Sequence, residues 1–170
     1  MAKVYIGIDN GVTGTLAVVG ELGSTFRKVP TKIEVDYQKS KVHKRTRIDH
    51  MALCEFLSEV KTRCDMLGLD IMVVCERPMS NKIRFDATVS AARAMESTVI
   101  ALETYQLPYQ WIDSGAWQKV ILPKGCKGDD LKKASADIGC RLFPAFTDAI
   151  RKHKDADSLL MAEWARRAGR

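Results

Sequence analysis

The stretch that most constrains the fold is residues 3–20, KVYIGIDNGVTGTLAVVG. Residues 4–8 form a near-continuous apolar run, which suits a strand buried on both faces of a sheet. Asp9 closes the run, and two nearby glycines permit a tight turn into a second strand over residues 15–19. A carboxylate at the tip of a central strand, beside such a turn, can hold a metal ion or support a phosphate.

Two kinds of protein place an acid at this point. RNase H-like nucleases use it as a metal ligand, whereas sugar kinases and actin-like ATPases hold phosphate with an Asp-x-Gly-x-Thr turn, which residues 9–13 also fit. In a third interpretation, Asp9 only caps the turn. The kinase interpretation needs a second phosphate turn and a longer chain. A later Asp-x-Gly, at residues 137–139, falls inside a predicted helix.

Two further acids favour the nuclease interpretation. Residues 71–75 form another short apolar strand, and Glu76 stands at its end. If this strand is a parallel neighbour of the first, Asp9 and Glu76 meet at the carboxyl edge of the sheet, where open α/β sheets bind ligands. Asp157 lies in the first turn of the last predicted helix, where the helix dipole alone can also explain an acid.

The other segments predict an α/β chain. Residues 24–29 close an antiparallel meander with the first two strands, and residues 109–112 form a fifth strand. Residues 30–47 are polar and lack a clear period, so we expect a mobile or extended connection, and residues 79–86 predict a polar loop. Helices are expected over residues 50–67 with Asp49 as N-cap, 87–102, a short segment capped by Ser114, 129–143 and 155–168.

Bulk properties fit one basic domain spanning residues 1–170. The net charge is +6, and residues 27–47 hold eight Lys or Arg against Glu34 and Asp36, which is compatible either with phosphate contact or with a solvated loop. The five cysteines suggest neither a disulfide framework nor a zinc site. Because no signal region or membrane-spanning run is evident, we expect a cytoplasmic location.

Several short blocks, taken together, resemble RuvC-type crossover junction endodeoxyribonucleases, and most closely their phage-encoded relatives. The blocks follow the family order from residue 4 to about residue 167. They are Ile6-Gly7-Ile8-Asp9 with Gly11 and Gly14, Glu76-Arg77-Pro78-Met79 with Phe85, residues 90–96, Trp117-Gln118-Lys119, Arg141-Leu142-Phe143-Pro144 and Ala156-Asp157-Ser158-Leu159-Leu160.

This resemblance implies an RNase H-like mixed five-stranded sheet flanked by helices, a homodimer, and Mg²⁺-dependent cleavage of four-way (Holliday) DNA junctions by paired nicks. Phosphodiester hydrolysis with two divalent ions requires clustered hard oxygen ligands. We therefore expect Asp9, as the bridging ligand, together with Glu76 and Asp157 to hold two Mg²⁺ ions, with Mn²⁺ as a substitute. No nucleotide cofactor and no membrane are expected.

The fourth acidic position departs from the family pattern. RuvC relatives carry an acid, or sometimes a His, three or four residues before the last Asp, where this chain has Lys154 and His153. Asp155 is about 200° away from Asp157 on an ideal helix, so it can ligate only if the helix starts late; otherwise it is the N-cap. His153 either ligates the metal or positions the attacking water, or else contacts phosphate or solvent. Both residues stay candidates.

The resemblance also places Lys119 and Lys132 near the scissile phosphate or the DNA backbone, with Lys133 as the ambiguous neighbour, and makes Phe85 a loop aromatic that stacks on bases. A solvated helix face and a buried loop anchor are the structural alternatives. The expected DNA-binding set is Lys119, Lys127, Lys133, Phe85, Arg84, Lys44, Arg45 and Arg47.

Three functions stay open. The leading one is a structure-selective endonuclease for four-way and other branched DNA. The second is a less selective RNase H-fold nuclease for branched or flap DNA. The third is a junction-binding protein with weakened catalysis, which the changed fourth position keeps open.

Overall fold

A mixed five-stranded sheet forms the centre of the computed structural model, which describes residues 2–38, 41–78 and 85–170. The strand order is β3-β2-β1-β6-β7, antiparallel between β3, β2 and β1 and parallel between β1, β6 and β7. The expected meander and the parallel neighbours are thereby confirmed. The strands are β1 Lys3–Ile8, β2 Thr15–Gly20, β3 Gly23–Lys28, β6 Asp70–Glu76 and β7 Tyr109–Ile112.

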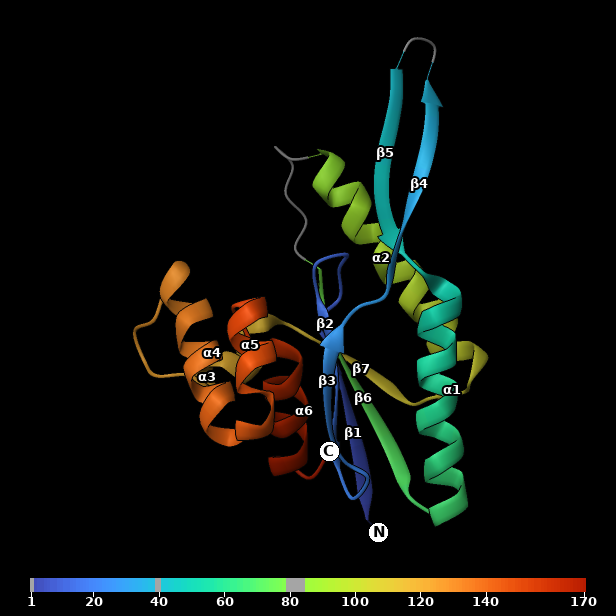
Figure 1. Cartoon of the computed structure of the whole chain (residues 1–170). Helices are drawn as coiled ribbons and strands as arrows, with labels where there is room; N and C mark the ends of the chain where they lie inside the picture. Colours follow the sequence, from blue (N-terminus) through green and yellow to red (C-terminus); the bar gives the residue numbers. More distant parts are fainter. Residues whose placement is uncertain (1, 39–40, 79–84) are drawn as a thin grey trace.

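Helices cover both faces of this sheet. Helices α1 and α2 lie on one face, and α3 to α6 lie on the other (Figure 1). Successive β1 residues contribute to the two cores alternately, since Ile6 packs with the α1 side and Tyr5 with the α6 side. This burial on both sides explains the continuous apolar run in the sequence. The helices are α1 His50–Leu67, α2 Phe85–Thr104, α3 Ser114–Ile121, α4 Asp129–Leu142, the 3-10 turn η1 Pro144–Phe146, α5 Thr147–His153 and α6 Asp157–Arg167.

Several predicted helix boundaries need correction. Helix α2 begins at Phe85, so residues 85 and 86 are helical rather than part of the expected loop. Ser114 is the first helical residue of α3, and Asp113 occupies the N-cap. Asp49 is the N-cap of α1 as expected, although its side chain makes no capping hydrogen bond.

The last predicted helix, residues 155–168, corresponds to α6 alone, and the short helix α5 before it was not predicted. Helix α5 ends at His153, and α6 begins only at Asp157. Lys154 between them has φ 81°, a left-handed conformation that ends α5. Ala156, not Asp155, is the N-cap of α6. The sequence did not reveal α5 because it has only seven residues and one fully buried apolar side chain, Ile150.

Close contact fixes α6 against the sheet. A side chain at Gly7 of β1 would collide with the backbone carbonyl of Ser158 in α6. The Thr15 hydroxyl of β2 also donates a buried hydrogen bond of 2.7 Å to the Ser158 hydroxyl. The start of α6 is therefore held directly against the ends of β1 and β2.

For residues 30–47, predicted as a mobile or extended connection, the described residues have regular secondary structure. They form a β-hairpin of strands β4 Thr31–Gln38 and β5 Lys41–Ile48, which projects from the sheet beside α2 (Figure 1). Residues 33–37 alternate apolar and polar side chains with the period of a strand, a signal that the prediction overlooked, and Ile48 at the base of the hairpin is buried in the core. Its described apolar residues Ile33 and Val35 are 66% and 41% exposed. No helix in the described part of the chain is long and apolar enough to cross a membrane.

Candidate active site

Asp9 and Glu76 meet at the carboxyl edge of the sheet, as predicted. In the parallel register Ile8 pairs with Cys75, so the next residues along, Asp9 and Glu76, lie side by side. Burial raises the pKa of Glu76 to about 8, and the nearby charges of Asp9, Asp157 and Asp155 add to this effect.

The turn after β1 holds Asp9 in place. The Asp9 N–H donates to the Thr15 carbonyl at 3.0 Å, and a side chain at Gly14 would collide with the Asp9 carbonyl. The neighbouring Asn10 side chain accepts a hydrogen bond of 2.9 Å from the Thr98 hydroxyl of α2. The glycine turn is therefore needed for close backbone approach, and a contact with α2 anchors it.

Asp157 reaches the same edge from the first residue of α6. Its carboxylate accepts a hydrogen bond from the hydroxyl of Ser135, a buried residue of α4. Burial raises the pKa of Asp157 to about 6, and the neighbouring Asp155 raises it further, while the Ser135 hydrogen bond and the Lys132 charge act in the opposite direction. The helix-dipole explanation does not account for this convergence with acids from other elements.

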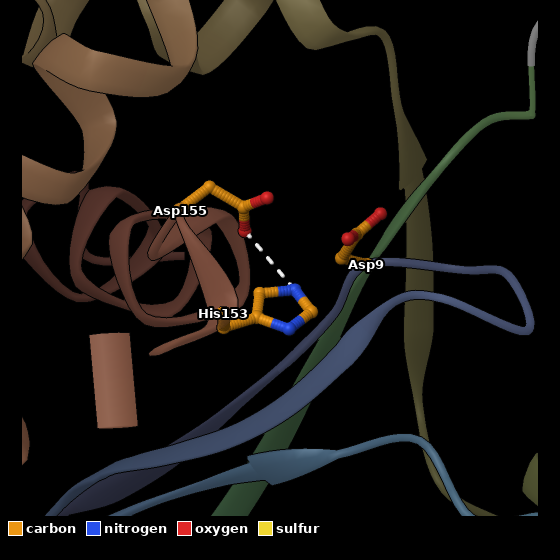
Figure 2. A group of neighbouring side chains, drawn as sticks. All are labelled: Asp9, His153 and Asp155. Carbon is orange, nitrogen blue, oxygen red and sulfur yellow. Dashed lines mark ion pairs between the residues drawn. The ribbon is translucent and has the colours of Figure 1, made fainter. Parts of the chain in front are cut away.

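The last residue of α5 and the turn before α6 complete the cluster. His153 Nε2 lies 3.4 Å from Asp155 Oδ1, and both side chains face Asp9 (Figure 2). One ligand atom from each of these three residues lies within 4.8 Å of the other two. Asp155 is only 7% exposed, and its Oδ1 has no hydrogen-bond partner among the described residues. The late start of α6 thus brings Asp155 into the site.

The site concentrates negative charge with little compensation. Burial raises the pKa of Asp9 to about 7, and the charges of Asp157 and Asp155 raise it further, whereas the Lys132 ammonium lowers it. Buried carboxylates that repel one another and an oxygen without a donor are the features expected of a divalent cation site. The residues present therefore fit a divalent ion.

Two solved structures share this arrangement of elements. RuvC of T. thermophilus in complex with a Holliday junction substrate matches with a TM-score of 0.55 at 13% identity, over 98% of this chain and 96% of that one. A second structure of Thermus thermophilus RuvC matches with a TM-score of 0.51 at 14% identity, with the same coverage. The chain has the RuvC fold. Neither a protein-family model nor a curated protein matches the sequence.

The RuvC fold is the RNase H-like mixed sheet flanked by helices that the sequence resemblance implied. Within it, the structure brings together the residues expected at the catalytic centre. Lys132 of α4 is near enough to lower the pKa of both Asp9 and Asp157. The residues that converge are Asp9, Glu76, Asp157, Asp155, His153 and Lys132.

The expected DNA-binding residues are more dispersed over this RuvC fold. Lys119 of α3, Lys133 of α4 and Lys127 in the loop before α4 are exposed on the α6 side of the sheet. Phe85 is 75% exposed at the start of α2, so it is not a buried anchor. Arg84 lies outside the described residues.

The remaining three, Lys44, Arg45 and Arg47, lie on β5 of the hairpin. They line a groove of about 840 Å³ between β5 and α2, which Arg93 and Val12 also border. Val12 belongs to the turn that follows Asp9, so one end of the groove adjoins the candidate active site. Glu34 accepts hydrogen bonds from Arg47 at 2.9 Å and from Arg93 at 2.8 Å, which links the hairpin to α2.

Sequence reasoning missed Ser135 and the packing role of Gly7. Nothing in the local sequence distinguishes Ser135 from a solvated helix residue, because its partners lie 21 and 22 positions later in the chain. Gly7 carried a weak signal, since a glycine inside an apolar strand indicates close approach of another backbone.

Proposed function

We propose that this chain is a divalent-metal-dependent endonuclease that cuts branched DNA, with the four-way junction as its preferred substrate. The observation that carries the proposal is the convergence of Asp9, Glu76, Asp155 and Asp157 at one edge of a RuvC fold, with Lys132 beside them. The matching RuvC was solved with a Holliday junction substrate, which supports the substrate class.

Asp9, Glu76, Asp157 and Asp155 would hold two Mg²⁺ ions, with Mn²⁺ as a substitute, and His153 is a further ligand or positions the attacking water. Bound divalent ions supply an activated water and stabilise the charge on the leaving oxygen. In hydrolysis a water oxygen bonds to phosphorus, the P–O bond to one sugar oxygen breaks, and that oxygen takes up a proton. Lys132 offsets the carboxylate charge and attracts the scissile phosphate.

The basic residues would bind the DNA arms on both sides of this centre. Lys119, Lys127 and Lys133 would contact backbone phosphates beside α3 and α4, and Lys44, Arg45 and Arg47 would do so along the hairpin. The exposed Phe85 ring would face the unpaired bases at the junction centre, and Arg84 remains in the proposed DNA-binding set. Such contacts read phosphate position and DNA shape rather than sequence, so the affinity should depend on salt.

We also propose a homodimer, because two active sites related by a twofold axis can make paired nicks in a two-fold junction. The proposal includes no nucleotide cofactor and no membrane partner. It extends to a cytoplasmic location, inside a bacterial host cell if the chain is phage-encoded.

The test compares end-labelled duplex, flap, fork and four-way DNA as substrates, each with Mg²⁺ and with Mn²⁺. The proposal predicts that the four-way junction is cut fastest, in symmetric paired nicks. If flaps and forks are cut as fast as the four-way junction, the chain is instead a less selective nuclease for branched DNA. Junction binding without cleavage in either metal would mean that the chain is a binding protein.

A further inference from the structure

Ser135 is a buried hydroxyl that touches two parts of the candidate site at once. It lies on α4, is 1% exposed, and donates a hydrogen bond to Asp157 Oδ1. The same oxygen accepts a hydrogen bond of 3.0 Å from the backbone N–H of Ala156. A single side chain from a separate helix thus holds both the carboxylate of Asp157 and the peptide group between Asp155 and Ala156.

This contact falls where the backbone most needs support. Asp155 and Asp157 are only two residues apart, and a regular helix would point them in different directions. They reach the same site because the chain leaves α5 through the left-handed Lys154 and starts α6 three residues later, at Asp157. The peptide group between Asp155 and Ala156 sets the direction of the Asp155 side chain, and its N–H is the one that Ser135 binds.

The turn itself supplies no equivalent support. Ala156 is the N-cap of α6, and no side chain of the described residues caps that helix. An N-cap with an oxygen-bearing side chain would normally stabilise such a start. Instead α4 packs directly on the turn, since a side chain at Gly139 would collide with the Ala156 methyl group. Gly139 and Ser135 are four residues apart on α4 and therefore share one face of that helix.

The same helix face also carries charge to the site. Lys132 lies three residues before Ser135, one turn away on α4. Its ammonium acts on Asp9 and Asp157, and Ser135 touches Asp157 directly. Helix α4 therefore faces the acid cluster with one cation and one hydroxyl, while the carboxylates come from the sheet edge and from α6.

We infer that Ser135 is a positioning residue, which holds the 155–157 segment in the arrangement that binds a divalent cation. The inference rests on the proposed metal-dependent function of this site. The Ser135 hydrogen bond holds one oxygen of Asp157 toward α4 and fixes the rotation of the carboxylate. Without it, the carboxylate and the turn can rotate away from Asp9, and the cation loses part of its ligand set.

The test is Ser135→Ala in the full chain, read in two ways. Hydrogen bonds that support metal ligands in this way change metal affinity by about 10- to 100-fold. We therefore expect the Mg²⁺ concentration needed for half-maximal junction cleavage to rise about 10-fold, with metal-free junction binding unchanged. The second readout needs no DNA, because it follows the rise in melting temperature produced by Mg²⁺ alone. This titration should shift to higher Mg²⁺ by the same factor.

Two further variants separate positioning from simple stability. Ser135→Thr keeps the hydroxyl, so it should restore most of the Mg²⁺ response even where the extra methyl lowers the melting temperature. Ser158→Ala removes another buried serine hydroxyl, which accepts a hydrogen bond from the Thr15 hydroxyl and not from a group of the acid cluster. Ser158→Ala should lower the melting temperature without changing the Mg²⁺ concentration at which the metal stabilises the protein.

An unchanged Mg²⁺ titration in Ser135→Ala, or an equal shift in Ser158→Ala, would overturn the inference, as would a parent protein that Mg²⁺ does not stabilise. If the parent is stabilised by Mg²⁺ but cuts no DNA, the proposed nuclease function fails. The inference on Ser135 would still stand in that case, provided that Ser135→Ala loses the stabilisation.

Discussion

The acid cluster and the β4–β5 hairpin gather charge in opposite ways. The cluster draws like charges from the ends of β1 and β6 and from the turn before α6, and it partly buries them, so that the pKa values of Asp9 and Glu76 rise. The hairpin carries its charges on one local stretch at the surface. There Glu34 lies between Arg47 and Arg93, and hydrogen bonds from Arg93 and Arg47 lower its pKa.

This difference shows what each region needs from the rest of the molecule. Carboxylates that repel one another stay together only if rigid elements surround them, and here β1, β6, α4 and α6 do so. The hairpin needs no such enclosure, because exposed ion pairs contribute little to stability and can exchange partners. The first region can hold a small cation in fixed geometry, whereas the second suits a long polyanion.

The largest effect should come from disrupting the packing of α6 against β1, which helps to enclose the acid cluster. Gly7→Ala places a methyl group against the Ser158 carbonyl, so α6 must move away from β1. We expect the free energy of unfolding to fall by about 3 kcal/mol and any Mg²⁺ response to disappear. Urea unfolding measures this, with Gly11→Ala as the control because no described atom lies near its added methyl. Equal stability of Gly7→Ala and the parent would show that α6 is not held in this way.

Like-charge burial should also make stability depend on pH. Folded Asp9, Glu76 and Asp157, with pKa values of about 7, 8 and 6, keep protons that the unfolded chain has already released at pH 5 to 8. The folded state therefore binds more protons, and its stability falls as pH rises through this window, by on the order of a few kcal/mol in total.

Melting temperatures of the metal-free protein between pH 5 and 8 test this. Asp9→Asn removes one of the buried charges, so its melting temperature should fall less with pH than that of the parent. Added Mg²⁺ should stabilise the parent most at pH 8. Parallel pH curves for the two proteins would mean that neither burial nor the neighbouring carboxylates raise the pKa of Asp9 in the folded state.

The smallest effect should come from the hairpin. The double change Lys44→Ala with Arg45→Ala should weaken junction binding by about 3- to 10-fold at low salt, and lower the salt slope of log K by about one for each phosphate that these side chains bind. The melting temperature and the rate of junction cleavage at saturating protein should not change. Fluorescence anisotropy measures the binding, with Lys61→Ala on α1 as the control. If the double variant loses no more junction affinity than Lys61→Ala does, the hairpin does not contact the DNA.

The sheet and its two acids could be predicted because local patterns determine them. Strand β1 is buried on both faces, so its sequence is a continuous apolar run, and Asp9 marks where that burial ends. Glu76 ends β6 in the same way, and parallel pairing then places the two acids together. The mixed five-stranded fold followed from these features together with the resemblance to RuvC-type nucleases.

The remaining parts depend on long-range packing that no local pattern reveals. In the hairpin only β4 has a clear apolar alternation, at residues 33–37, and no comparable pattern marks β5 as its partner strand. The place of Asp155 depends on where α6 begins, and this is set by the left-handed Lys154 and by packing against α4. Ser135 became visible only once α4 was placed against the turn. Sequence therefore identified the candidate ligands better than the residues that orient them.

The central claim is that the acid cluster is the active site for DNA cleavage, and one measurement tests this claim most directly. A labelled four-way junction is incubated in Mg²⁺ with one of three proteins: the parent, Asp9→Asn or Asp70→Asn. Asp70→Asn is the control, because Asp70 lies at the opposite end of β6 from the site. We expect paired symmetric nicks from the parent and from Asp70→Asn. Asp9→Asn should bind the junction but cut it at least about 10²-fold more slowly, since removing a ligand should have a larger effect than removing a hydrogen bond that supports one. Equal cleavage by Asp9→Asn and the parent would contradict the claim.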